Sequence, residues 1–142
     1  MRQEERPLPE YAALTGVFGA VLGGFLLLAR GRLPKRVPFG DMLRIGLASY
    51  KLGRLVAKDD VTTWVRAPVT QDPDATEPKP RGVERALGEL VTCPYCVGAW
   101  TASGLSYALV LFPRPTRLVT TIFGAQAIAD FLNTAYVKLR ED

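Results

Sequence analysis

The chain has 142 residues, enough for one domain, and a net charge of +4 with a sequence pI of about 9.3. It contains two cysteines and no histidine, which excludes Ser-His-Asp and Cys-His catalytic groups and removes the commonest metal ligand. Apolar residues make up 48% of the chain, but they collect in uncharged runs separated by stretches dense in charge. A bilayer selects this segregation, so we expect an all-α integral membrane protein.

The first uncharged run covers residues 11–29 and follows a charged N-terminal tail at 1–10. At 1.5 Å per residue this run gives roughly 28 Å of helix, which suffices for a first transmembrane helix. A cleaved signal peptide is the alternative, but the tail contains acidic residues and no clear cleavage site follows. Gly19 and Gly23 form a GxxxG pair, which either admits a closely packed helix or reflects the ordinary glycine content of membrane helices.

Residues 30–67 form a basic segment that we expect in the cytoplasm, and its main element is a helix at 41–58 with Asp41 as N-cap. Lys51, Arg54 and Lys58 follow one another at i, i+3, i+7 on this otherwise apolar helix. Such a basic stripe predicts an interfacial helix on an anionic leaflet, with these three residues at the lipid interface. A short or re-entrant span is the alternative. The proline-rich stretch 68–82 is predicted to be a flexible, solvated loop.

Residues 83–138 are predicted to form a helical hairpin. Its transmembrane helices cover about 93–112, with Pro94 in the first turn, and about 118–137, with Thr116 as the cap. A tight turn at 113–115 joins them, so the chain has three predicted spans. Lys and Arg residues gather in cytoplasmic loops. Only four of the 18, namely Arg2, Arg6, Arg114 and Arg117, lie on the other side. We therefore expect an outside N-terminus and a cytoplasmic C-terminus.

Cys93-Pro94-Tyr95-Cys96 has the letters of the glutaredoxin redox motif. A helix N-terminus favours the thiolate of its first cysteine, and the second cysteine can resolve a mixed disulfide. The predicted context, a helix before the motif and a span after it, differs from a glutaredoxin fold. Cys93 and Cys96 are thus redox candidates, structural thiols in a reducing compartment, or half of a zinc site that a dimer completes. No cofactor is expected.

Asp130 is the one carboxylate inside a predicted span, and Gln126, Asp130 and Asn133 share a helix face at i, i+4, i+7. A carboxylate at this depth must face protein or a water-filled cavity. This intramembrane polar site is either a proton or cation site or a hydrogen-bonded patch that fixes helix packing. In the packing interpretation Asp130→Asn is nearly tolerated. The candidate partners are then Thr101, Ser103 and Tyr107.

Five segments carry a recognisable combination: 50–56, 60–68, 88–90, 92–100 (with the Thr-Cys-Pro-x-Cys motif) and 129–133. Together they resemble a family of small bacterial membrane proteins catalogued as a domain of unknown function, some of whose members are labelled sporulation proteins. The longer actinobacterial members share the N-terminal span. The resemblance covers about 40–138 and implies no activity, cofactor or catalytic residue.

These observations predict a multi-pass protein of the bacterial cytoplasmic membrane. We expect a non-enzymatic accessory or scaffolding protein that acts through transmembrane helices, with a protein partner or as a homo-oligomer. Its other partner is the lipid bilayer. Nucleic acid is not expected, because no aromatic interleaving accompanies the basic stripe. The alternative functions are a thiol redox protein using Cys93 and Cys96 and a small proton or ion conduit using Asp130.

Overall fold

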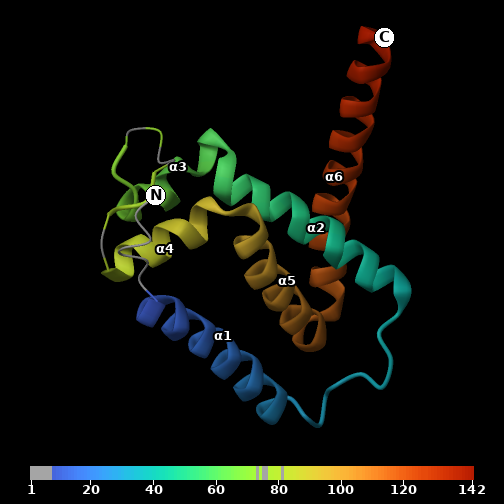
Figure 1. The fold of residues 1–142 in the computed structure, drawn as a ribbon. Coiled ribbons are helices and arrows are strands. Elements are labelled where there is room, and N and C mark those ends of the chain that lie inside the picture. The colour runs from blue at the N-terminus through green and yellow to red at the C-terminus, as the bar shows by residue number, and fades with distance from the viewer. Residues whose placement is uncertain (1–7, 73, 75–76, 81) are drawn as a thin grey trace.

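The computed structural model describes residues 8–72, 74, 77–80 and 82–142. Within these residues the regular elements are all helices, so the predicted all-α class is confirmed, and a single isolated bridge joins Thr70 to Pro78. Most of the predicted tail at 1–10 lies outside the described residues. The helices, drawn in Figure 1, are α1 (Leu8–Leu28), α2 (Phe39–Lys58), η1 (Asp60–Thr62), α3 (Thr63–Arg66), η2 (Ala67–Val69), α4 (Gly82–Thr92), α5 (Pro94–Leu111) and α6 (Pro113–Glu141).

Among the described helices, α1 alone has both the length and the apolar character of a membrane span, with a mean hydropathy of 1.9. None of its residues is buried inside the protein. One such helix near an N-terminus is also what a signal sequence provides, so α1 by itself supports membrane association only weakly. The three predicted spans are not established by the helices themselves.

Helix α2 is the centre of the structure and packs mainly on α5 and α6 (Figure 1). It runs in the same direction as α6, because Asp41 near its start pairs with Arg117 and Lys51 further on pairs with Asp130. It runs against α5, because Gly53 near its end lies on the first turn of that helix. Helices α2, α5 and α6 therefore form a three-helix body with α2 in the middle.

Helices α1 and α5 run in the same direction. The Phe18 ring packs edge-on against Trp100 at a centroid distance of 5.0 Å, and Phe25 stacks on Tyr107 at 4.3 Å. Both helices advance by seven residues between these contacts, which is two helical turns along the same axis direction. Trp100 and Tyr107 thus hold α5 against α1.

Two helix starts differ from the sequence prediction. Pro38 is the N-cap of α2, and Asp41 lies in its first turn, where its buried carboxylate pairs with arginine side chains. Helix α6 begins at Pro113 with Phe112 as N-cap, so Thr116 is a buried residue inside the helix and not its cap. In α6 the fixed φ of Pro113 starts the helix without help from a capping hydroxyl.

The segment after α2 covers the end of that helix. Arg66 is only 1% exposed, and its guanidinium donates hydrogen bonds to the carbonyl oxygens of Val56 at 2.6 Å and Asp59 at 3.0 Å. A cation at a helix C-terminus satisfies carbonyl groups that have no partner in the helix and opposes the negative end of the dipole. Through Arg66, the segment after α2 therefore caps the C-terminus of that helix.

Small residues form the core where the helices meet. Among the residues that the structure describes, the buried apolar side chains all belong to alanines: Ala29, Ala48, Ala57, Ala86 and Ala127. At Gly53 the backbones themselves are in contact, because an added Cβ would lie 2.7 Å from the Pro94 carbonyl oxygen and 3.2 Å from the Gly98 nitrogen. Close approach through small residues is typical of helices packed in membranes.

We expect Gly53→Ala to destabilise the fold by about 1–3 kcal/mol, because the new methyl group meets rigid backbone and α2 must move off α5. Gly46→Ala is the matched control, since it lies two turns earlier on α2 and an added Cβ there meets nothing within 4 Å. Thermal unfolding in a mild detergent, followed by circular dichroism, measures the difference. Equal stability of the two variants would contradict the backbone contact at Gly53.

Candidate functional site

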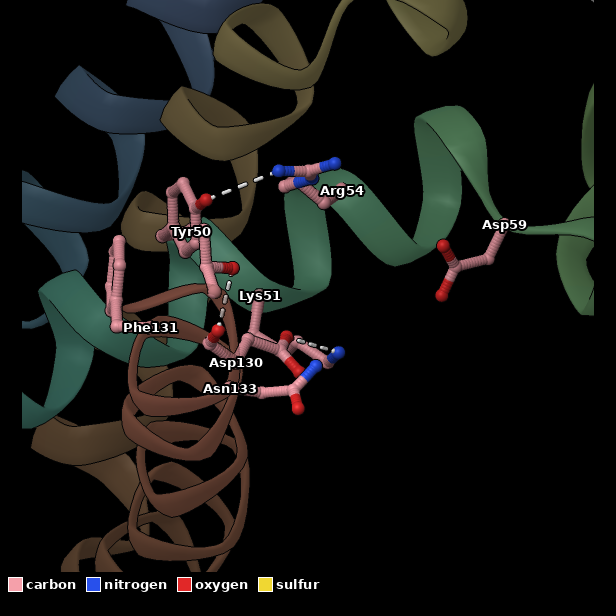
Figure 2. A pocket seen from close by; sticks show the side chains of 8 residues that line it. Tyr50, Lys51, Arg54, Asp59, Asp130, Phe131 and Asn133 are labelled. Carbon is pink, nitrogen blue, oxygen red and sulfur yellow. Dashed lines mark hydrogen bonds and ion pairs between the residues drawn. The ribbon is translucent and has the colours of Figure 1, made fainter. Parts of the chain in front are cut away.

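A polar crevice lies between α2 and α6 (Figure 2). Beyond it the end of α6 projects from the three-helix body (Figure 1). Its volume is about 340 Å³. The crevice brings together two residues of the predicted intramembrane polar site and two of the predicted basic stripe; the third polar residue, Gln126, does not line it. We call it the α2/α6 crevice; its principal lining residues are Tyr50, Lys51, Arg54, Asp130, Phe131 and Asn133.

Asp130 forms an ion pair with Lys51, drawn in Figure 2, and the Nζ–Oδ2 distance is 2.6 Å. The predicted partners were wrong. The hydroxyls of Thr101 and Ser103 donate to carbonyls of their own helix, and Tyr107 stacks on α1. The reason is the position of α2, which covers this side of α6 and presents a cation to Asp130. The charge of the Asp130 carboxylate is therefore compensated by the Lys51 ammonium.

A second contact crosses the same crevice. The Tyr50 ring stacks on Phe131 with a centroid distance of 5.2 Å, and its hydroxyl accepts a hydrogen bond of 3.3 Å from Arg54 (Figure 2). The predicted basic stripe is therefore divided. Lys51 faces Asp130 on α6, and Lys58 lines a groove on the α5 side. Arg54 lines both the crevice and that groove. For Arg54 and Lys58 the lipid contact stays a prediction.

The other two residues of the predicted polar site, Gln126 and Asn133, have exposed side chains. Within the described part of the chain, neither amide has a hydrogen-bond partner, although each can donate and accept. Asn133 lines the α2/α6 crevice beside Asp130. The ion pair thus satisfies the carboxylate of the predicted polar site and leaves its two amides available.

Cys93 is the N-cap of α5, and Pro94 follows in the first turn, as the sequence predicts. The Cys93 sulfur accepts a hydrogen bond of 3.4 Å from the backbone N–H of Cys96, and both thiols are free. An N–H donated to sulfur favours a thiolate, so the geometry is compatible with the redox hypothesis. In the described residues no group of three or more potential ligands gathers around the pair to hold a metal ion.

Comparison with known proteins places most of this body in one family. A family model described as "Protein of unknown function (DUF1360)" matches residues 44–136. The chain is 28% identical over 112 residues to UPF0713 protein YngL of Bacillus subtilis. This match covers 73% of the present chain and 86% of YngL. It is 22% identical over 104 residues to the sporulation protein YjcA of the same organism, covering 66% and 88%. No solved structure matches.

The Lys51–Asp130 pair changes the expected effect of Asp130→Asn. The amide keeps the shape of the carboxylate but leaves the Lys51 ammonium, whose side chain is only 19% exposed, without a counterion. We expect Asp130→Asn to destabilise the fold more than the double variant Lys51→Met/Asp130→Asn, with a coupling energy on the order of 1 kcal/mol because the Asp130 side chain is half exposed. A double-mutant cycle measured by thermal unfolding in detergent checks this value. A coupling energy of zero would show that the Lys51–Asp130 ion pair does not stabilise the fold.

Proposed function

We propose that this chain, which belongs to the DUF1360 family of proteins of unknown function, is a membrane scaffold that works by self-association and not by catalysis. The observation that carries the proposal is the surface of α6. Every residue of the helix after Ala127 is exposed, and large apolar side chains point outward along it. In Figure 1 the last turns of α6 stand clear of the other helices. A surface of this kind needs an apolar environment or a partner.

One stripe of α6 has the pattern of a helix–helix interface. Its members recur at alternating spacings of three and four residues, and all of them are exposed. That spacing is the signature of a seam between two helices packed at a small crossing angle. We call this stripe the α6 seam; it consists of Val119, Ile122, Gln126, Ala129, Asn133 and Tyr136.

The two amides explain why lipid alone is a poor cover for the α6 seam. Gln126 and Asn133 lie one heptad apart, and hydrocarbon offers no partner for their donors and acceptors. A second helix satisfies them, and interhelical hydrogen bonds of this kind contribute about 0.6 kcal/mol on average. A second copy is the fitting occupant. In a two-fold dimer, parallel α6 helices bring each amide opposite its own equivalent, and an amide can donate to and accept from another amide.

The alternative functions have less support. The conduit hypothesis used Asp130 as a free titrating group, whereas its pairing with Lys51 favours a packing role. The redox hypothesis retains one favourable observation, the N-cap position of Cys93 with an N–H bonded to its sulfur. We therefore keep thiol redox chemistry as the second candidate function.

The helix directions support four membrane crossings. If α1 and α5 both cross a bilayer, their parallel packing requires one crossing between them. Helix α2 fits that role because it has 20 residues and runs against α5. Its charges Asp41 and Lys51 are paired with α6, which lowers the cost of placing them in hydrocarbon. The four proposed spans are α1, α2, α5 and α6.

This arrangement places the N-terminus, the segment 59–93 and the C-terminus on one face of the membrane. Seven of the 18 basic residues then lie toward the other face, which leaves 11 on the face of the termini and favours a cytoplasmic location for both ends. The seven are Arg30, Arg32, Lys35, Arg36, Arg44, Arg114 and Arg117. The charge count along the sequence alone favours three spans and an outside N-terminus, so the two topologies are distinguishable.

The self-association proposal predicts that the amides stabilise a dimer. We expect Gln126→Leu and Asn133→Leu each to raise the dissociation constant about threefold, and the double variant about tenfold, because each substitution removes one interhelical hydrogen bond per dimer. Energy transfer between labelled copies in vesicles, measured at several protein-to-lipid ratios, gives these constants.

Thr121→Val is the matched control for this experiment. Thr121 is an exposed polar residue of α6 outside the α6 seam, and its hydroxyl donates to the Arg117 carbonyl of its own helix. The control should dimerise like the unaltered chain. Two results would refute the α6 seam as the association surface. One is a monomer at every protein-to-lipid ratio, and the other is a dissociation constant that neither amide substitution changes.

The four-crossing topology predicts that residues 29–38 and 59–93 lie on opposite faces. In a Cys93→Ser/Cys96→Ser background, single cysteines at Lys35 and at Gln71 should react with a membrane-impermeant maleimide from opposite sides of the membrane. Intact cells and inverted vesicles supply the two sides. Labelling of both positions from the cytoplasmic side would restore the three-span topology with α2 at the interface.

A further inference from the structure

A second hollow lies on the other side of α2, against the start of α5, and the proposed scaffold role does not use it. Its volume is about 570 Å³, within the range of ligand pockets of roughly 300–1,000 Å³. We call it the α2/α5 groove; the residues that decide its chemistry are Gly46, Ser49, Arg54, Lys58, Tyr95 and Gly98.

The middle of the groove is open because glycines form its floor. An added Cβ at Gly46 would meet nothing within 4 Å, and one at Gly98 would meet only the Ser49 carbonyl oxygen at 3.9 Å. Helices α2 and α5 touch nearby at Gly53, so these missing side chains leave a channel beside a tight contact. A channel with a backbone floor between two helices suits a slender apolar chain.

One end of the groove is cationic. Arg54 and Lys58 lie one turn apart at the C-terminal end of α2, and none of the lining residues is acidic. Across the described residues, no carboxylate lies within ion-pair distance of either side chain, in contrast to Lys51. The Arg54 guanidinium is oriented by its hydrogen bond to Tyr50. Tyr95 is 88% exposed at the same end, where an amphipathic ring suits a membrane–water interface.

We propose that the α2/α5 groove binds an acidic glycerophospholipid. Its phosphate is held by Arg54 and Lys58, and one acyl chain lies over Gly46 and Gly98. The positive charges of Arg54 and Lys58 favour an acidic lipid, because two unpaired cations near a bilayer attract acidic headgroups. The glycine floor selects an amphiphile, because a free phosphate would leave Gly46 and Gly98 uncovered. The inference goes beyond the proposed scaffold and uses only its membrane location.

The test uses the full chain purified in a neutral detergent. Phosphatidylglycerol and phosphatidylcholine with identical acyl chains are added in separate titrations, and native mass spectrometry counts the lipid retained per copy. We expect one phosphatidylglycerol per copy to be retained at concentrations where phosphatidylcholine is lost. Equal retention of the two lipids would overturn the proposal.

Charge variants test the headgroup end. We expect Arg54→Gln and Lys58→Gln each to weaken phosphatidylglycerol binding about fivefold, and the pair about twenty-five-fold. Arg140→Gln, at the exposed end of α6, is the control and should bind like the unaltered chain. Unchanged binding in the double variant, with helix content intact by circular dichroism, would overturn the assignment of the phosphate.

A filling variant tests the acyl end. Gly46→Leu places a side chain into open space in the groove, so the fold should persist while phosphatidylglycerol binding falls at least tenfold. Gly104→Leu, also in open space but elsewhere on α5, should have no effect. If Gly46→Leu binds normally and inorganic phosphate displaces the lipid, the site is a simple anion site and the lipid proposal is wrong. In vesicles of phosphatidylcholine alone, Gly46→Leu should dimerise like the unaltered chain, so failure of the lipid proposal is distinguishable from failure of the dimer proposal.

Discussion

The contact of two backbones at Gly53 determines how the rest of the molecule is arranged. Because no side chain separates the helices there, the end of α2 lies directly on the first turn of α5. This approach holds α2 against α5 along one side and leaves its other side for α6. Both hollows follow from that position. The α2/α6 crevice opens where α6 extends past α2, and the α2/α5 groove opens beside the glycine contact.

Charge fixes the register of α2 on α6. Near its start α2 contributes an anion, Asp41, whose buried carboxylate accepts from both Nε and Nη2 of Arg117 as well as from Arg44. Further along, α2 contributes a cation, Lys51, which forms an ion pair with Asp130 of α6. A buried carboxylate is costly without its partner, and the forked guanidinium geometry is specific. Sliding α2 along α6 by one turn would separate both pairs, so the parallel arrangement has a single favourable register.

Local signals in the sequence predicted some features well. Pro94 marks the start of α5, and the uncharged run at 11–29 lies within one helix apart from its last residue. The partner of Asp130 was missed because it depends on where α2 packs. An amphipathic helix with basic residues has the same sequence pattern on a membrane surface and inside a bundle. One signal was present: Asp41 and Lys51 have the opposite charges of Arg117 and Asp130, at a similar spacing along each helix.

Helix α2 also links the two proposed binding surfaces through one short chain of contacts. Arg54 lines both hollows and donates to Tyr50, whose ring stacks on Phe131 of α6, two residues before Asn133 of the α6 seam. An anion bound in the α2/α5 groove would hold Arg54 and Tyr50 in place and so bias the position of α6. An aromatic stack contributes about 0.5–1.5 kcal/mol, so this link limits the coupling between lipid binding and self-association to roughly tenfold. The Lys51–Asp130 pair also holds α6 against α2, and it does not involve Arg54. The dimer therefore does not need the lipid in order to form.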